Sequence, residues 1–209
     1  MSESAVTLGA QAGARMEPSP YGIESKKLAI WLFIIADAAT FGAMLFAYGY
    51  LRLANPDWSR PFAFWPTIAN AVAMTVVLLV SSLTMVVAVG TAQAGQKATT
   101  VRWLGVTMLL GLVFAVLHLW EWSGMFAEGW RLFQNPLGGS ALFGATFFSI
   151  TGLSLLHVIA GIIALAVITR GYLRGRFDTG HIETTGLYWQ FVNVVWMFVF
   201  PLVYLMNAR

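Results

Sequence analysis

Long apolar runs separated by short polar segments dominate the chain. Five runs are long enough to cross a hydrocarbon core as a helix, which takes about 20 residues. They cover residues 28–51, 65–89, 103–126, 141–168 and 185–206. The runs are continuous rather than alternating, which excludes a membrane β-barrel. The pattern predicts an all-α integral membrane protein built as a bundle of five transmembrane helices.

The composition favours the same class. Of the 209 residues, 58% are hydrophobic and 10% are charged, and the mean hydropathy is +0.73, whereas a soluble domain carries about 25% charged residues. The net charge of +3 is not gathered into an exposed basic cluster, so no nucleic-acid partner is expected. The chain has no cysteine, which excludes disulfides, iron–sulfur clusters, c-type haem attachment and thiolate metal sites.

The distribution of basic residues predicts how the chain lies in the membrane. Residues 1–26 are expected to be a flexible polar tail without a secretory signal, and residues 27–209 to be the transmembrane domain. The tail and the second and fourth connections hold Arg15, Lys26, Lys27, Lys97, Arg102, Arg170, Arg174 and Arg176. The opposite side holds Arg52, Arg60, Arg131 and Arg209. This excess predicts a cytoplasmic N-terminus and a C-terminus outside.

Four ionisable side chains fall inside the spans, namely Asp37, His118, Glu121 and His157. A charge in the membrane centre costs roughly 2.5–3.5 kcal/mol on insertion scales, so such a group is either paired or functional. For Asp37, the sequence favours equally a role in proton handling and a structural role as a neutral, hydrogen-bonded carboxyl. For Glu121, a structural pairing with His118, three residues away, is favoured. The two histidines could also ligate a haem, although their unequal depths in the membrane disfavour it.

Each span also carries polar or small residues at helical spacing. On the fourth span they are Thr151, Ser154, His157 and Gly161. Such stripes allow transmembrane helices to pack closely and to hydrogen-bond. We therefore favour interhelical hydrogen bonding for Gln190 and Asn193 on the fifth span, with substrate binding as the alternative. Pro201 removes a backbone donor and predicts a kink.

Four segments, in order along the chain, resemble motifs of haem-copper oxidase subunit III. WLFIIADAATFGAMLFAY (31–48) is similar to W-L-F-x-x-S-E…F-x-A-Y, and TVVLLVSSLTMVVA (75–88) is similar to L-L-x-S-S-x-T. FGATFFSITGLSLLHVIAGI (143–162) resembles G-x-x-F-F-x-x-T-G…H-V-x-x-G, and ETTGLYWQFVNVVWMFVF (183–200) resembles E-x-x-x-x-Y-W-H-F-V-D-x-V-W. The resemblance covers nearly everything from Trp31 onward and points to the short, five-helix bacterial form of the family.

This resemblance implies a subunit without chemistry of its own in a cytochrome c oxidase-type complex of the aerobic respiratory chain. Haem and copper would lie in partner subunits, above all the catalytic subunit I, and no cofactor or metal is expected in this chain. The subunit would bind phospholipid between its helices and support proton uptake in a bacterial inner membrane. A respiratory supercomplex is a further candidate partner.

The resemblance also implies roles for single positions. Asp37 stands where the family has an intramembrane Glu, and Glu183 stands at its Glu before the last helix. Gln190 replaces a family His, Asn193 an Asp, and Ser154 another His, so this face loses titratable groups. The candidate proton-related or structural carboxylates are Asp37, Glu121 and Glu183. The candidate packing or lipid-cleft residues are His118, Thr151, Ser154, His157, Tyr188, Trp189, Gln190 and Asn193.

Three alternatives stay open. The chain could be an accessory subunit of a nitric oxide reductase-type complex, to which the same motifs would apply. A haem-b membrane anchor rests on His118 and His157 alone. A proton-coupled transporter rests on Asp37 and Glu121, but it would call for internal repeats or broken helices, and the sequence has neither.

Overall fold

Five long helices make up the computed structural model, which describes residues 25–138 and 140–209. They are α2 (Ser25–Ala54), α3 (Ala69–Gln93), α4 (Lys97–Ala127), α5 (Leu142–Leu173) and α6 (Thr179–Val199). A π-helical turn, η1 (Phe64–Ile68), precedes α3, and a second, η2 (Phe200–Tyr204), follows α6, before the short 3-10 turn η3 (Leu205–Asn207). With these extensions, all five helices are long and apolar enough to cross a membrane. The prediction of an all-α, five-helix membrane protein is confirmed. The expected tail lies, up to residue 24, outside the described residues.

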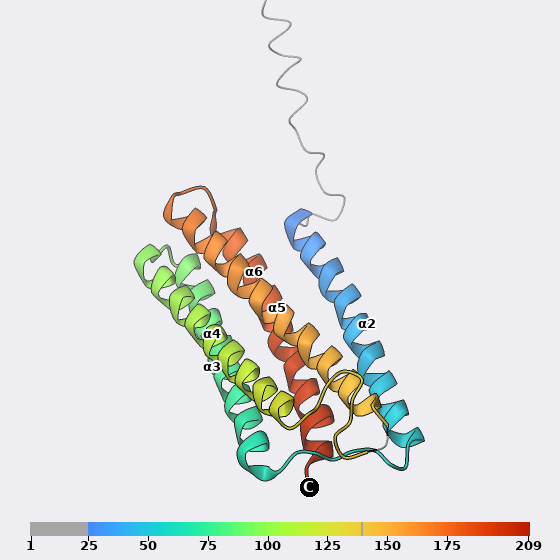
Figure 1. Ribbon diagram of the computed structural model, residues 1–209. Helices are drawn as coiled ribbons and strands as arrows, with labels where there is room; N and C mark the ends of the chain where they lie inside the picture. The colour runs from blue at the N-terminus through green and yellow to red at the C-terminus, as the bar shows by residue number, and fades with distance from the viewer. Residues whose placement is uncertain (1–24, 139) are drawn as a thin grey trace, which may run out of the picture.

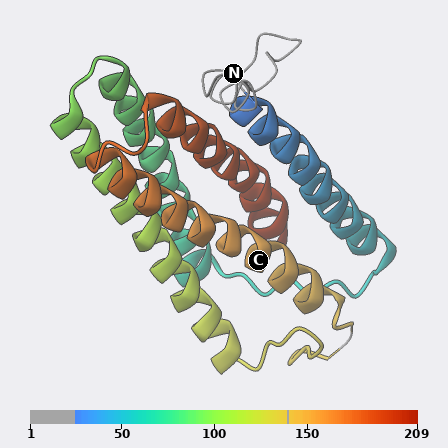
Figure 2. The same cartoon turned by 90° about the horizontal axis from the view of Figure 1, so that it is seen from above.

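Four of the helices form a closed ring of neighbours. α3 packs against α4 and α6, and α5 packs against the same two helices. α2 lies along one side of this ring and contacts α6 and α5 (Figures 1 and 2). The start of α2, the α3–α4 turn and the α5–α6 turn share one end of the bundle, which we call the N-terminal end (Figure 1). The chain finishes at the opposite, C-terminal end, together with the other two connections.

Tight turns close the N-terminal end. Gly95 follows the C-cap of α3 and Gly175 follows the C-cap of α5. Both have positive φ (71° and 68°), the left-handed conformation that glycine adopts without strain just after a helix. α6 then begins with Asp178 as its N-cap, whose side chain accepts a hydrogen bond from the His181 amide at 3.2 Å. The antiparallel pairs α3–α4 and α5–α6 follow directly from these short connections.

The core of the ring is aromatic. The Trp189 side chain is fully buried and donates from Nε1 to Ser81 Oγ at 3.2 Å. Glycines make room for its ring, because a Cβ built on Gly111 or Gly161 would lie 2.7 or 2.9 Å from Trp189 atoms. The small residues on α4 and α5 thus set how closely α6 approaches.

Pro201 changes the helix type rather than ending the span. α6 gives way at Phe200 to η2, which has the proline at its second position. Proline lacks the amide proton that would continue the α-helical ladder, and the wider π-helical turn carries the backbone on into η3. This turn places the buried Tyr204 in the core at the C-terminal end.

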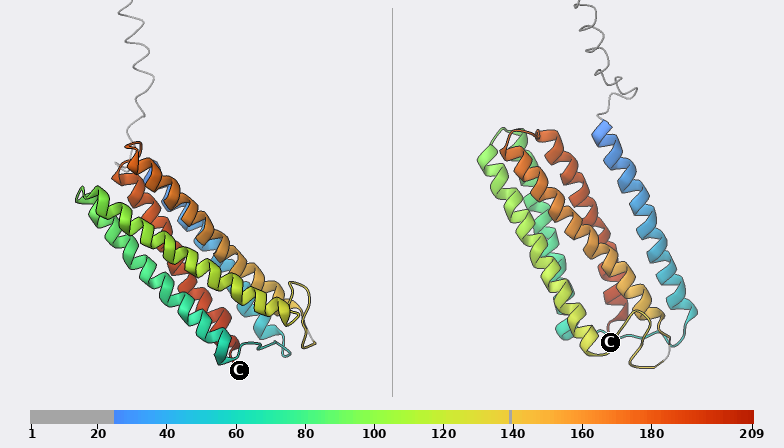
Figure 3. Two further views of the ribbon diagram at one scale, coloured as in Figure 1. Left: turned by 60° about the vertical axis from the view of Figure 1, so that its left-hand side comes forward. Right: turned by 45° about the horizontal axis from the view of Figure 1, so that its top comes forward.

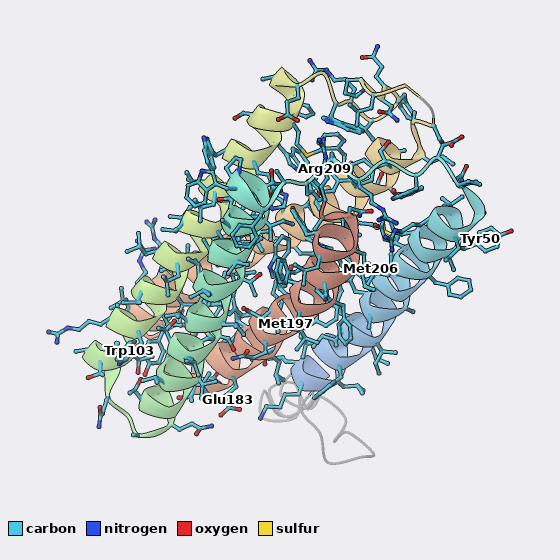
Figure 4. All side chains as sticks on the ribbon, turned by 90° about the horizontal axis from the view of Figure 1, so that it is seen from below. Tyr50, Trp103, Glu183, Met197, Met206 and Arg209 are labelled. Carbon is cyan, nitrogen blue, oxygen red and sulfur yellow. The ribbon has the colours of Figure 1, made fainter. Side chains whose placement is uncertain are left out.

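α2 is bound more loosely than the other helices. Only Phe41 and Tyr48 of α2 are buried, and large apolar side chains such as Leu32, Ile35 and Phe46 are exposed by 60%, 63% and 78%. Figure 3 shows α2 on the flank of the bundle, and in Figure 4 Tyr50 points away from the other helices. Such surface on a membrane-crossing helix faces lipid or another protein.

Candidate functional site

A carboxyl–imidazole pair joins α2 to α5 inside the bundle. Asp37 Oδ2 lies 3.1 Å from His157 Nε2, and both side chains are largely buried, with exposures of 13% and 11%. The orientation falls short of a hydrogen bond, and Oδ2 has no other partner among the described residues. The edge of the Phe41 ring packs against the imidazole, with centroids 5.4 Å apart. Asp37 lies about 18 Å along the helix from the start of α2, so the pair is well inside the span.

Hydrogen bonding on the far side of the imidazole fixes its protonation pattern. His157 Nδ1 is 2.8 Å from the Leu153 carbonyl oxygen, and because a carbonyl only accepts, Nδ1 carries a proton. Nε2 and Asp37 Oδ2 then face one another with room for a single shared proton. Tyr188 donates from its hydroxyl to the His157 carbonyl at 2.9 Å, which holds this part of α5 against α6.

Glu121 has a different partner from the one expected. Tyr204 donates from its hydroxyl to Glu121 Oε2 at 3.1 Å, while Glu121 Oε1 and both ring nitrogens of His118 lack a hydrogen-bond partner within the described residues. The predicted His118–Glu121 pairing is therefore wrong. The His118 ring instead packs among aromatic rings, including Trp196 at 5.7 Å and Trp122 at 5.5 Å, and η2 brings Tyr204 to the carboxyl.

Glu183 belongs to a polar network at the N-terminal end. Its carboxylate lies 2.9 Å from Lys27 Nζ and accepts from Gln93 Nε2 at 2.8 Å, so it connects α6 with α2 and α3. Figure 4 labels Glu183 near the start of α6. Beside it, His181 lies 3.1 Å from Lys26 Nζ. Its Nδ1 lies 2.5 Å from Asp178. This last contact lowers the pKa of the exposed Asp178 carboxyl below its usual value.

The polar stripes divide between cross-helix and local contacts. Gln190 joins α6 to α3, because its Oε1 accepts from the Ser82 hydroxyl and its Nε2 donates to the Ser82 carbonyl at 3.1 Å. Asn193, by contrast, donates to the Trp189 carbonyl of its own helix at 2.8 Å. Thr151 and Ser154 likewise donate to carbonyls of α5, at 2.8 and 3.0 Å. Of these side chains, Gln190 is the one that makes the interhelical bonds.

Sequence reasoning missed several buried cross-helix bonds. Trp196 donates to Thr75 Oγ1 at 3.0 Å between α6 and α3, and Thr84 shares a 2.8 Å hydrogen bond with Thr107 between α3 and α4. Trp and Thr are common in any span, so only the register between helices reveals these pairs. Trp189 likewise proves to be a core residue, bonded to Ser81.

Cavities flank α2 within the described part of the chain, three of them with volumes of 270 Å³ or more. The largest, about 480 Å³, lies between α2, α3 and α6 and is lined by apolar side chains together with Lys27, Gln93, Glu183 and Gln190. A second, about 370 Å³, lies between α2, α5 and α6 and includes Tyr188. A third, about 270 Å³, follows α2 and α6 toward the C-terminal end and is almost wholly apolar in its lining.

The histidines do not fit a bis-histidine haem. His157 Nδ1 is bonded to the Leu153 carbonyl, and Nε2 faces the Asp37 carboxyl at 3.1 Å. An iron atom at Nε2 would have to displace Asp37. Within residues 25–138 and 140–209, no group of three or more His, Cys, Asp or Glu side chains is placed to hold a metal ion.

The five helices long and apolar enough to cross a membrane place this chain among the multi-pass helical membrane proteins. The buried carboxyl–imidazole pair lies inside the bundle. A family model described as cytochrome c oxidase subunit III matches residues 21–208, and the chain belongs to this family. The resemblance of the four motifs is thereby confirmed.

Relatives with informative names are similar along most of the chain. A cytochrome bo(3) ubiquinol oxidase subunit 3 from Pseudomonas aeruginosa is 33% identical, over 85% of this chain and 83% of the relative. A probable quinol oxidase subunit 3 from Staphylococcus aureus is 30% identical, over 88% of this chain and 90% of the relative. A haem-copper oxidase subunit I+III from Aeropyrum pernix is 27% identical over 91% of this chain, which corresponds to 24% of that longer protein. The chain is a subunit III of the haem-copper or quinol oxidase type.

Proposed function

We propose that this chain is the non-catalytic subunit III of a bacterial respiratory oxidase whose partner subunits hold the haem and copper and reduce oxygen. The family match over residues 21–208 carries this proposal. The relatives from Pseudomonas aeruginosa and Staphylococcus aureus are named as ubiquinol or quinol oxidase subunits, which favours quinol as the electron donor of the complex.

The partner of this chain is the catalytic subunit I. The relative from Aeropyrum pernix is named as a subunit I+III, and a single chain that carries both parts supports direct packing of the two. The exposed apolar surface of the five helices gives such a partner a large area to contact. Further oxidase subunits, and a respiratory supercomplex, are candidates for the remaining surface.

Phospholipid fills the cavities beside α2. Their lining is mostly apolar, as acyl chains require, and the largest has Lys27, Gln93, Gln190 and Glu183 for a headgroup. A lysine near a membrane surface contributes about 1 kcal/mol of attraction to an anionic lipid. Bound lipid would supply the packing that α2 lacks on these sides.

Proton uptake is supported by the Asp37–His157 pair. The two groups share room for one proton, and their burial away from bulk water would keep that proton from exchanging freely. The excess of basic residues at the N-terminal end favours a cytoplasmic location for that end, in the inner membrane of a bacterium. The pair would then draw protons from the cytoplasmic side.

The test is to purify the chain from its native membranes in mild detergent through an affinity tag at its C-terminus. We expect a large, histidine-rich oxidase subunit to co-purify, with all haem assigned to that subunit in a redox difference spectrum. Quinol-driven oxygen consumption should follow the same fractions. Haem bound to this chain alone, or fractions without an oxidase subunit, would contradict the proposal.

A further inference from the structure

A separate cavity opens at the C-terminal end, on the side of the bundle away from α2. It has a volume of about 150 Å³ and lies between the last two turns of α4 and the segment that leads into α3. Glu121, Glu128, Thr67 and Asn70 provide its polar lining, and Phe62 and Trp120 provide aromatic surface. We propose that this cavity binds the ethanolamine headgroup of a membrane phospholipid through its primary ammonium group.

The α4 wall of the cavity is acidic. Glu121 and Glu128 are seven residues apart and therefore lie on one face of the helix, two turns or about 10 Å from one another. Glu128 is exposed, whereas Glu121 is only 7% exposed. Glu121 Oε2 receives the Tyr204 hydroxyl, but Oε1 has no hydrogen-bond donor among the described residues. A buried carboxyl oxygen without a donor is costly, so the inner end of the cavity favours a ligand that brings one.

The opposite wall also offers acceptors. Asn70 donates from Nδ2 to the Leu117 carbonyl at 3.4 Å, which leaves its side-chain oxygen to accept, and the Thr67 hydroxyl lies one turn away. No Lys, Arg or His belongs to the lining. Arg131, just beyond α4, donates instead to the carbonyls of Phe126 and Trp130. The C-terminus of α4 adds the negative end of its dipole, so the cavity selects a cation.

A primary ammonium matches this chemistry. It carries a positive charge and three N–H donors, whereas a quaternary ammonium carries no donor for Glu121 or Asn70. The volume corresponds to about five water molecules, which is too large for a bare metal ion and suits a small organic cation with a short carbon chain. Trp120 and Phe62 provide aromatic surface that attracts cations.

The surroundings of the cavity indicate a lipid rather than a soluble amine. Trp120 is exposed at its rim, and Val116, Val113 and Leu109 continue the same side of α4 as an exposed apolar stripe. Glu128 is the C-cap of α4, and headgroups are expected near the end of a membrane-crossing helix. A headgroup in the cavity would therefore place its acyl chains along this stripe.

The test measures phospholipid retained by the tagged complex after a detergent wash that removes loosely bound lipid. Native mass spectrometry would compare the wild-type chain with Glu121→Gln, and with Asp57→Asn as a control that neutralises an exposed carboxyl between α2 and η1. We expect Glu121→Gln to retain phosphatidylethanolamine at least about tenfold more weakly, because it loses a charged hydrogen bond. Asp57→Asn should keep this lipid at the wild-type level, because Asp57 lines neither this cavity nor those beside α2.

A second measurement needs no variant. Delipidated wild-type complex is reloaded with phosphatidylethanolamine, phosphatidylcholine or phosphatidylglycerol, and we expect a preference of about tenfold or more for the first. Equal retention by Glu121→Gln would overturn the proposal. So would equal binding of phosphatidylcholine, a metal ion recovered from the site, or a partner's lysine cross-linked to Glu121. Because the readout is bound lipid, it is separate from whether an oxidase co-purifies.

Discussion

The Asp37 carboxyl and His157 Nε2 face one another at 3.1 Å, and Asp37 Oδ2 has no hydrogen-bond partner within the described residues. A buried ion pair or shared proton is stable only while both partners are present, and removal of one partner typically costs about 3–5 kcal/mol. The pair therefore has a structural role, the attachment of α2 to α5, and the role proposed for it above is to take up a proton. Substitutions that keep the shape of the Asp37 side chain can separate the structural role from the proton role.

The first prediction concerns Asp37→Asn, which should keep the attachment of α2 to α5 but remove the titratable carboxyl. The amide keeps the size of the carboxyl and can donate to His157 Nε2, so the complex should assemble, but residue 37 can no longer take up a proton. If the pair carries most of the flux, we expect proton uptake during turnover to fall by roughly an order of magnitude. The measurement is oxygen consumption together with external pH in reconstituted vesicles.

The matched control is Asp37→Glu, which restores a titratable carboxyl at this position. It should recover most of the uptake. Unchanged proton uptake in Asp37→Asn, with normal oxygen consumption, would show that the carboxyl is structural only.

The second prediction concerns Gln190, whose amide makes two hydrogen bonds to Ser82. Gln190→Leu should destabilise the α3–α6 contact by about 1–2 kcal/mol, the range found for interhelical hydrogen bonds in membranes. Ser82→Ala should remove the hydroxyl bond but keep the bond to the carbonyl, so its cost should be smaller. Thermal unfolding in detergent, arranged as a double-mutant cycle, measures the coupling. Independent, additive effects would contradict a direct interaction.

At the scale of the helices, close approach depends on glycine. Gly111 faces the Trp189 ring, and an added Cβ would stand 2.7 Å from it, so Gly111→Ala should force α4 and α6 apart and cost about 1–3 kcal/mol. Gly105 lies on the same helix with nothing within 4 Å of such a Cβ. Gly105→Ala should be neutral or slightly stabilising. The comparison is the midpoint of thermal unfolding, and equal midpoints for the two variants would contradict the packing argument.

The helices themselves were predictable from sequence because continuous apolar runs of this length have few other stable states in a chain of this composition. Their ends were less predictable: the third span, expected at 103–126, is α4, which begins at Lys97. Its first turn is polar and extends beyond the apolar run. The π-helical turn at Pro201 was foreseen as a kink, but its role in delivering Tyr204 to Glu121 required the register of η2 against α4.

The candidate site was predictable only one residue at a time. Asp37, His157 and Glu121 stood out because an ionisable group inside a membrane span costs free energy. This signal can be read from the sequence of one span alone. Which group meets which depends on the packing of α2 on α5 and of η2 on α4. His118 shows the limit, since spacing along one helix suggested Glu121 as its partner while the rings of α6 and α4 surround it.

At the scale of the whole molecule, α2 makes polar contacts with the rest of the bundle at three separate levels. Lys27 meets Glu183 at the N-terminal end, Asp37 meets His157 inside the bundle, and Tyr48 and Arg52 bond to the Asn207 side chain and the Met206 carbonyl at the C-terminal end. Cavities lie between these levels on both sides. The helix is thus fixed in register while much of its surface remains available to lipid and to a partner subunit.

The orientation of the bundle gives the last prediction. The N-terminal end gathers most of the basic residues, which membrane insertion retains in the cytoplasm. Because the chain lacks cysteine, one introduced thiol reports one location. Gln96→Cys, exposed in the α3–α4 turn, should react with an impermeant maleimide only in inside-out vesicles. Leu137→Cys, 62% exposed at the other end, should react only in spheroplasts. The reverse pattern would place the N-terminal end outside and the Glu121 cavity on the cytoplasmic side. The proposed direction of proton uptake would then be reversed.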